Sequence, residues 1–304
     1  MTVGDNAITF AGMVEDGIIA GSAVTQIMTE AFNESLVGKL TKSIPMPITG
    51  TKMAFTTGEP VAGIVGEGEL KPIVSSGIGI KTATPIKAAA IMYLTKEAEQ
   101  GDRLRYTQIL KQQLKDACKR AIDLAVFHGK DGVTGDTIAN VEYVAQTSNT
   151  VTLPSGTDPV EFRDTISAGY DLATDFGNGF DAFAAAPTMR TRISAAQQKT
   201  DENISFNDSA GTFGGLPVYY SKTVPGNYGV VPDSNIRVIG GEFKDNIGFG
   251  YVENITLQRS TEATIVDGDK TISLWQNNLI AYLAEVQFGW IIGDVNKFVK
   301  YSNA

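Results

Sequence analysis

Two side chains in this sequence could form a nucleophile and its base: the single cysteine, Cys118, and the single histidine, His128. Such a pair works only if the two groups come within hydrogen-bond distance. Both lie in one predicted helix, ten residues apart, so their directions differ by about 280° around the helix axis. We therefore expect no dyad. Cys118 fits the apolar stripe as a small core residue, and His128 lies in the last turn, where an imidazole suits the helix dipole and a capping role.

Other familiar catalytic and ligand-binding patterns are missing from the sequence. One histidine and one cysteine cannot build the usual zinc site, and neither a Walker A motif nor a G-x-S-x-G elbow occurs. The stretches GIVGEG and GIGIK do not open a helix after a strand, so they are poor phosphate cradles. The pairs Glu67 with Glu69 and Asp267 with Asp269 stand in turn-like surroundings, where a solvated loop explains them better than catalysis or calcium binding. We expect no cofactor, no metal and no enzyme of a familiar class.

The composition is that of a folded protein with an acidic balance. Of 304 residues, 42% are hydrophobic and 19% are charged, which is enough apolar material for a sizeable core. The 25 basic and 34 acidic residues give a net charge of -9, which argues against tight binding of nucleic acid or anionic membranes through a broad basic surface. A protein that merely encloses nucleic acid stays compatible with this charge.

Cysteine usage and the start of the chain indicate where the protein folds. A single cysteine excludes an intrachain disulfide, so a reducing compartment fits. No run of 18 apolar residues occurs, and the first basic residue is Lys39, so the N-terminus lacks the basic region of a signal peptide. We expect the chain to be made in a cytoplasm and to have no membrane segment.

Two helices have clear signals in the sequence. The longest is predicted over about 102–128 and would span roughly 40 Å. Its apolar residues are spaced by threes and fours on one face, and Gly129 stands where a C′ glycine would end the helix. The stretch DPVEF predicts the start of a second helix, with Asp158 as N-cap and Pro159 and Glu161 in the first turn.

The rest of the chain alternates short strands with turns. A short buried strand is expected at FDAFAAAP, residues 180–187, and TMRTRISAAQQK after it predicts a further amphipathic helix. The last third is mostly β in pattern, in IRVIGGEF, IGFGYVENITLQRS and LIAYLAEVQFGWIIG. This mixed order of helices and strands predicts the α+β class.

Two segments lack the residues of a core of their own. Residues 66–87, GEGELKPIVSSGIGIKTATPIK, read as strand, turn and strand with few large apolar side chains. A two-stranded ribbon of this kind does not hold its shape alone in water. The first 35 residues are small and acidic with scattered apolar residues. We expect both segments to lie against another surface; the alternatives are a flexible surface hairpin and a poorly ordered terminus.

The order of several motifs resembles the major capsid proteins of tailed bacteriophages. These motifs are a two-stranded excursion with the tip GEGELKP, a long helix closing on FHGKDG, the segment FGGLPVYYSKTVP, the strand region GEFKDNIGFGYVENITLQRS and a final strand with AEVQFGW. The resemblance runs over nearly the whole chain. It implies the Johnson fold of the Hong Kong-type phage capsid family, an α+β fold that encapsulins share.

The architecture of that family implies a division of this chain into four parts. These are an N-terminal arm (N-arm), 1–35; a peripheral domain, 36–49, 89–144 and 255–304, with a long spine helix at about 102–128; an extended loop (E-loop), 50–88; and an axial domain, 145–254. In the family, the N-arm and the E-loop each reach across a neighbouring subunit.

The resemblance implies a structural function. Such proteins self-assemble into pentamers and hexamers of an icosahedral shell, the virion capsid, which encloses double-stranded DNA without sequence-specific binding and is assembled in the bacterial host cytoplasm. The implied partners are further copies of the chain, a portal and a decoration protein. Some members begin with a long scaffolding segment, whereas this chain enters the arm almost at Met1. We therefore expect a separate scaffolding protein.

The resemblance also points to contact residues. Those of the E-loop would be Val61, Ile64, Val65, Leu70, Lys71, Ile73, Val74, Ile78 and Ile80. In some members an E-loop lysine forms an isopeptide bond with an asparagine of another subunit, assisted by a glutamate. The matching residues here are Lys71, Asn277 or Asn278, and Glu285. The alternative places Lys71 in a salt bridge, the asparagines in a turn and Glu285 as an ordinary strand carboxylate.

Two other functions stay open at this point. An encapsulin-type compartment would have the same fold, and the content of native particles, DNA or protein cargo, distinguishes it from a phage capsid. A soluble α+β enzyme of unrecognised type would be a monomer or small oligomer with a compact active-site pocket.

Overall fold

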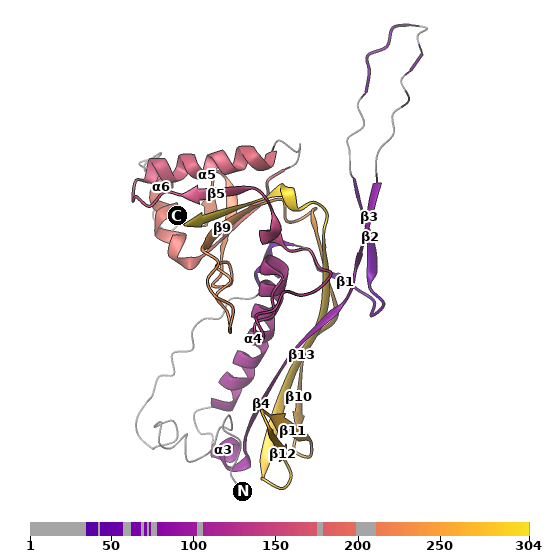
Figure 1. The fold of residues 1–304 in the computed structure, drawn as a ribbon, viewed down its shortest axis with the longest axis vertical. Coiled ribbons are helices and arrows are strands. Elements are labelled where there is room, and N and C mark those ends of the chain that lie inside the picture. The colour runs from indigo at the N-terminus through magenta and orange to yellow at the C-terminus, as the bar shows by residue number, and fades with distance from the viewer. Residues whose placement is uncertain are drawn as a thin grey trace. The chain divides into compact units, whose positions relative to one another are not determined.

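A computed structural model shows the fold of the chain (Figure 1). It describes residues 35–41, 43–56, 62–67, 70, 71, 73, 78–101, 106–174, 179–198 and 211–303. The chain divides into two compact units. Unit 1 comprises Met1–Leu36, Ile86–Asp123 and Glu253–Gln287, and unit 2 comprises Val37–Pro85, Leu124–Val252 and Phe288–Ala304. Apart from Ser35, the expected N-arm lies outside the described residues.

The helices, strands and 3-10 turns (η) follow one another in a mixed order. They are α2 (Leu36–Leu40), β1 (Ser43–Pro45), β2 (Thr51–Thr56), β3 (Ile78–Ala83), β4 (Ile86–Thr95), α3 (Lys96–Gln100), α4 (Tyr106–His128), η1 (Val144–Gln146), β5 (Thr150–Leu153), α5 (Pro159–Thr174), β6 (Ala182–Ala185), η2 (Pro187–Met189), α6 (Arg190–Gln198), β7 (Thr212–Phe213), β8 (Leu216–Tyr220), β9 (Ile236–Gly241), β10 (Ile247–Ser260), β11 (Thr264–Asp267), β12 (Lys270–Ser273), β13 (Leu279–Ile292), η3 (Val295–Lys297) and β14 (Phe298–Asn303).

Local signals place several of these elements correctly. The stretch IGFGYVENITLQRS forms β10, and LIAYLAEVQFGWII forms β13. The carboxylate of Asp158 accepts a hydrogen bond from the Val160 amide at 3.0 Å, so the predicted cap of α5 is confirmed. The long helix α4 ends at His128, because Gly129 has a φ of +63°, which L side chains rarely adopt.

Unit 1 is built on neighbouring strands and a small hairpin. Strand β13 lies between β10 and β4, and β11 pairs antiparallel with β12. The register sets Ile265 opposite Ile272, so both isoleucines face the same side of the hairpin. That side belongs to a compact apolar cluster. Its buried members are Tyr93, Ile272, Leu274, Leu279 and Ala281.

The part of α4 that belongs to unit 1 buries one face. Leu110, Leu114, Cys118 and Ile122 follow one another at intervals of four, and all four are buried. Cys118 is therefore a core residue, as predicted, and its burial raises the pKa of the thiol. A thiol that is held protonated in an apolar core is a poor nucleophile.

Unit 2 contains a six-stranded sheet in the order β5-β14-β9-β6-β8-β7. The last strand of the chain, β14, runs parallel to β5 and antiparallel to β9, so the chain end is inserted into the interior of the sheet. The central strand β6 is buried on both faces, which confirms the short buried strand predicted there and explains its uniform apolar sequence.

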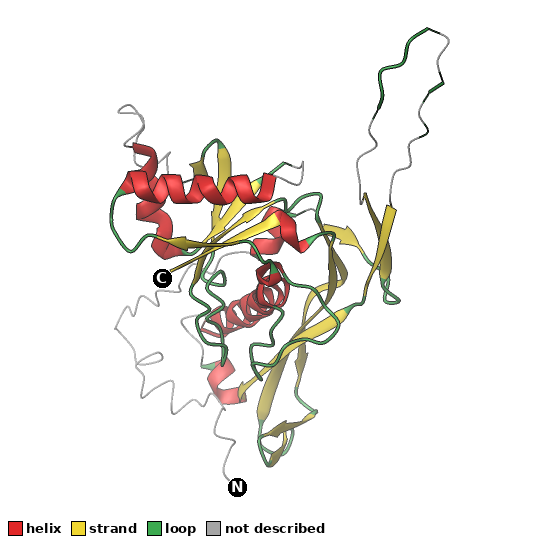
Figure 2. Cartoon of the chain, turned by 45° about the horizontal axis from the view of Figure 1, so that its top comes forward, coloured by secondary structure: helices red, strands yellow, loops and turns green. Residues whose placement is uncertain are grey.

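Helices α5 and α6 cover one face of this sheet (Figure 2). Side chains of both helices share one core cluster with alternate residues of the strands. From the helices come Phe162, Ile166, Ala173, Ile193 and Ala196, and from the strands Leu153, Phe183, Ala185, Phe213, Val218, Val238, Val299 and Tyr301. The amphipathic pattern of the sequence thus becomes a helix layer on a sheet.

One close approach in this layer needs a glycine. The Tyr301 hydroxyl crosses to α5 and donates to the Ile166 carbonyl at 2.9 Å. A Cβ placed on Gly169 would lie 2.3 Å from that hydroxyl oxygen, well inside any real contact. Gly169 therefore allows the Tyr301 ring to lie against the helix backbone.

We predict that Gly169→Ala destabilises unit 2 although alanine favours helices. The clash with Tyr301 should lower the free energy of unfolding by about 1–3 kcal/mol, which exceeds the gain of up to ~1 kcal/mol in helix propensity. Gly38→Ala is the control, because a Cβ at Gly38 has no heavy atom within 4 Å. Urea unfolding of both variants tests this. Equal stability of the two variants would contradict the role given to Tyr301.

Candidate functional site

The expected E-loop begins and ends as a two-stranded ribbon. Strands β2 and β3 form a sheet of their own, antiparallel, with Thr51 opposite Ala83 and Thr56 opposite Ile78 (Figure 1). A single pair of strands has no second layer to bury its side chains, so its stability depends on what its base and its tip contact.

The base of the ribbon is anchored to the rest of unit 2. The Lys81 ammonium donates to the Glu142 carboxylate at 2.7 Å and to the Ile292 carbonyl at 2.8 Å. Nearby, Ala83 is buried in a small apolar cluster with Met46 and Ile291. Polar and apolar contacts therefore both hold β3 where it leaves the body.

Two glycines allow close contacts at the base of the ribbon. Gly50 has a φ of +81°, and a Cβ there would meet the Ala83 carbonyl oxygen at 2.2 Å. A Cβ on Gly248, in β10, would lie 1.9 Å from the Met53 sulfur. The positive φ and the backbone contact at Gly50 require glycine, whereas a side chain at Gly248 would displace the flexible end of Met53 from β10.

Beyond the base, the described apolar side chains are open to solvent. Ile64, Leu70 and Ile73 have exposed fractions of 105%, 95% and 102%, and Val65 and Ile80 are also exposed. Lys71 is exposed as well. Val61 and Val74 lie outside the described residues, and of Ile78 only the backbone in β3 is described. Several exposed apolar side chains in one segment are a feature of protein interaction sites, so the contact role predicted for these residues stays a prediction.

The other residues of the suggested cross-link lie in unit 1, in hydrogen-bonded positions. Asn277 donates to the Ser273 carbonyl at 2.8 Å, and Asn278 donates to the Glu97 carboxylate. Glu285 forms an ion pair with Lys87 at 2.7 Å. These contacts agree with the alternative in which the two asparagines lie in a turn and Glu285 is an ordinary strand carboxylate. The cross-link itself stays a prediction.

Sequence reasoning missed a second polar cluster, within unit 1. Glu99 accepts hydrogen bonds from the Arg259 guanidinium at 2.9 Å and from the Tyr282 hydroxyl. Lys111 lies over the Tyr282 ring, 4.4 Å from its centre. Burial alone would raise the pKa of Glu99, but these hydrogen bonds and the charges of Arg259 and Lys111 outweigh it and lower that pKa. No local signal links residues so far apart in sequence.

His128 is a structural residue at the end of α4. It is buried, and its Nε2 lies 3.0 Å from the Val224 carbonyl, so the ring links the helix end to that loop. Burial lowers the pKa of the imidazole, helped by the charge of Lys130, and the hydrogen bonds to Val224 and Thr223 offset this only in part. A neutral ring that donates Nε2–H to a carbonyl fits this position.

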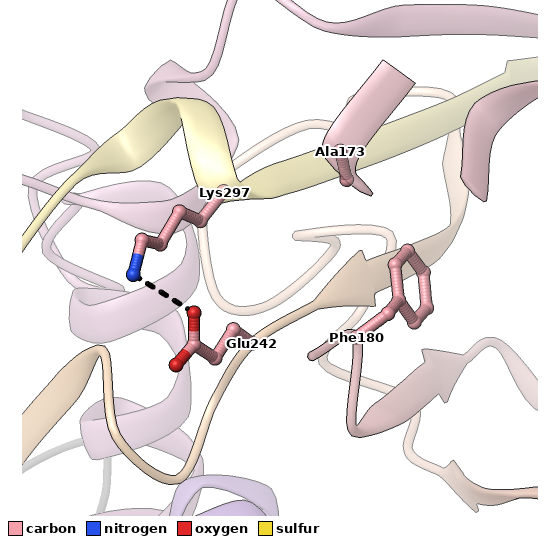
Figure 3. A pocket seen from close by; sticks show the side chains of 4 residues that line it. All are labelled: Ala173, Phe180, Glu242 and Lys297. Carbon is pink, nitrogen blue, oxygen red and sulfur yellow. Dashed lines mark hydrogen bonds and ion pairs between the residues drawn. The ribbon is translucent and has the colours of Figure 1, made fainter. Parts of the chain in front are cut away.

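The described residues contain no cluster of side chains that could hold a metal ion, and a hollow found in unit 2 is small. Where the structure describes the chain, no group of three or more potential metal-binding side chains occurs. A hollow in unit 2, lined by Ala173, Phe180, Glu242 and Lys297, has an empty volume of only about 160 Å³ (Figure 3). Its charged residues are paired with each other at 2.9 Å. Small-molecule sites are usually larger, about 300–1,000 Å³.

The described helices also lack a membrane-spanning segment: none of them is both long and apolar enough to cross a bilayer.

Comparison with known proteins gives a consistent result. Residues 17–303 match a family described as "Phage capsid family". Two relatives, from Mycobacterium phages D29 and L5, are each named "Probable major capsid protein gp17". The D29 protein is 22% identical, with 94% of this chain and 90% of the relative covered, and the L5 protein is 24% identical, with 95% and 90% covered.

Solved structures agree with this match over the full length. A chain from Gordonia phage Cozz has 26% identity and a TM-score of 0.77, with 100% of this chain and 98% of that chain covered. A chain from Mycobacterium phage Ogopogo has 21% identity and a TM-score of 0.75, with 96% and 99% covered.

The anchoring of the ribbon predicts the effect of removing its lysine. Lys81→Met should increase hydrogen exchange in β2 and β3 several-fold, because the ribbon loses its bonds to Glu142 and Ile292. Global stability should change by less than about 1 kcal/mol, since the ion pair is partly exposed. Lys52→Met, on the exposed side of β2, is the control. Identical exchange in both variants would show that Lys81 does not anchor the ribbon.

Burial of His128 predicts a pH dependence of stability. The pKa of His128 is lower in the folded chain than the usual value near 6.5, so the unfolded chain takes up the proton more readily. Stability is therefore complete above about pH 6.5 and decreases as the pH falls below it, by at most about 1.4 kcal/mol per pH unit. Thermal unfolding between pH 5.5 and 7.5 measures this slope. His128→Gln should flatten it, and an unchanged slope in that variant would assign the effect to other groups.

Proposed function

This chain belongs to the phage capsid family, and from that premise we propose that, as a phage major capsid protein, it assembles into pentamers and hexamers of an icosahedral shell around double-stranded DNA. It is a structural protein of the virion capsid, in a family of shell-forming proteins and not of enzymes. The observation that carries the proposal is the match over residues 17–303, joined with a ribbon whose apolar side chains are left uncovered.

The fold is the Johnson-type α+β fold of phage capsids. On it we propose an N-arm at 1–35, an E-loop at 50–88, an axial domain at 145–254 and a peripheral domain from the remaining residues. One change follows from strand pairing: β14 is counted with the axial domain, because it pairs with β5 and β9. The N-arm and the E-loop are proposed to contact neighbouring subunits.

We propose that the tip of the E-loop is buried by a second copy of the chain. Full burial of one leucine or isoleucine side chain contributes about 1.5–3 kcal/mol, so burial of Ile64, Leu70 and Ile73 offsets part of the cost of ordering the loop. The anchored base favours this contact, because part of the ribbon is already fixed before the subunits meet. A contact between different surfaces of identical subunits forms a ring when its rotation closes, and pentamers and hexamers require such a closed contact.

Charge supports a shell that holds nucleic acid without binding it tightly. The net charge of -9 limits attraction between the subunit and DNA phosphates. We propose that DNA enters by active packaging through a portal, that a separate scaffolding protein directs assembly in the host cytoplasm, and that a decoration protein binds the finished shell.

Electron microscopy tests this function directly. The chain is expressed alone and together with its neighbouring phage genes, and both samples are viewed in negative stain. Uniform shells or capsomer rings are expected, with DNA inside native particles; protein cargo instead would indicate an encapsulin-type compartment. A denaturing gel of the shells reports the cross-link, since isopeptide bonds from Lys71 would give a ladder in place of a single band. Dispersed monomers in both samples at high concentration would disprove the capsid function.

Substitutions at the ribbon tip test the proposed contact. Leu70→Asp and Ile73→Asp, singly and combined, should reduce shell yield at least ten-fold, because a carboxylate cannot be buried at an apolar contact without great cost. Both side chains are exposed in the single chain, so its melting temperature should not change. Leu70→Met and Ile73→Val keep the apolar character and should assemble normally. Normal shells from the double aspartate variant would show that these residues make no contact.

A further inference from the structure

Two buried carboxylates lie on α4, and they have different kinds of partner. Asp116 and Asp123 are 3% and 2% exposed, and they are the buried acidic side chains within the described ranges. A buried carboxylate is costly unless donors satisfy its oxygens. The partners of each therefore show what that side chain holds in place.

Asp116 is satisfied within its own helix. Its Oδ1 accepts from Gln112 Nε2 at 3.1 Å and faces Lys119 Nζ at 3.2 Å, one turn before and one turn after it. These contacts form as soon as the helix forms. Asp116 therefore supports α4 and ties no distant part of the chain to it.

Asp123 instead holds a segment far away in sequence. Its Oδ1 accepts from the Ser35 hydroxyl and its Oδ2 from the Leu36 backbone amide, both at 2.9 Å. The two donors are neighbours in the chain, and both are buried with the carboxylate. Hydrogen bonds to an ionised acceptor are the stronger and more directional kind, so both oxygens act together as a clasp.

The clasp lies where the expected N-arm joins the described chain. Residues 1–34 are joined to the body through Ser35, which Asp123 holds on α4. From this we infer that Asp123 is a positioning residue for assembly: it fixes the point from which the N-arm leaves the subunit. The inference rests on the proposed function, in which that arm contacts a neighbouring subunit.

A fixed origin matters because the arm is a tethered ligand. The effective concentration of a tethered segment at its site depends on the length and freedom of the tether. If Ser35 and Leu36 come loose, the tether lengthens and its origin moves over α4, so correct contacts with a neighbour become rarer. The loss of shells should then exceed what any loss of stability in the single chain explains.

The experiment compares Asp123→Asn with Asp116→Asn in the full-length chain. Each substitution replaces one buried carboxyl group on the same helix with an amide, and only the first touches the clasp. Ser35→Ala removes one hydrogen-bond donor of the clasp and serves as the test if Asp123→Asn fails to fold. Ser35→Thr keeps the hydroxyl donor and is the matched control for Ser35→Ala. The readouts are hydrogen exchange of the Leu36 amide, the melting temperature of unassembled subunits, and shell yield by electron microscopy.

We expect Asp123→Asn to speed exchange at Leu36 at least ten-fold and to reduce shell yield at least five-fold. Ser35→Ala should show smaller changes in both readouts. Asp116→Asn should have a melting temperature similar to that of Asp123→Asn, but its exchange at Leu36 and its shell yield should match those of the wild type. Ser35→Thr should also match the wild type in exchange and shell yield. Unchanged exchange in Asp123→Asn, or faster exchange with normal shells, would overturn the inference while the capsid function stands. Absence of shells and capsomer rings from the wild type, both alone and expressed with its neighbouring phage genes, would overturn the proposed function itself, and the inference with it.

Discussion

A two-stranded ribbon cannot cover its own side chains, and this constraint shapes the whole subunit. Strands β2 and β3 pair only with each other, and the described apolar residues between them are open to solvent. Removing apolar area from contact with water is favourable in free energy. Among the described residues, none covers the apolar side chains of Ile64, Leu70 and Ile73, and this is the basis for the contact with a second copy proposed above.

The base of the ribbon shows the opposite arrangement. Lys81 is bonded to Glu142 and to Ile292, and Ala83 is buried in an apolar cluster. Anchoring at the base removes part of the conformational entropy that a free loop would lose on binding. The segment is therefore anchored at its base, while its described apolar side chains near the tip are exposed.

The body that carries this ribbon depends on contacts between distant parts of the sequence. Strand β14 enters the sheet of unit 2 between β5 and β9, so that sheet is complete only when the end of the chain is present. Asp123 holds Ser35 across 88 residues in unit 1. Contacts of such long sequence separation slow folding, because loop closure must come before they form. The sheet of unit 2 and the contact of Ser35 with α4 therefore both depend on distant parts of the sequence.

Local patterns were sufficient for much of the secondary structure. The sequence alone determined the C-terminal end of α4, the N-cap of α5, the long strands β10 and β13 and the buried position of Cys118. These follow from hydrogen bonds and side-chain periodicity within a few residues. The order of motifs was enough to suggest the capsid family before any comparison was made.

Other features were decided only by tertiary structure. The place of β14 in the sheet, the Glu99 cluster with Arg259 and Tyr282, and the bond of His128 to Val224 join residues that no sequence window contains. Their cause is packing: a side chain is paired or buried according to what the completed fold brings beside it, and that depends on the entire chain.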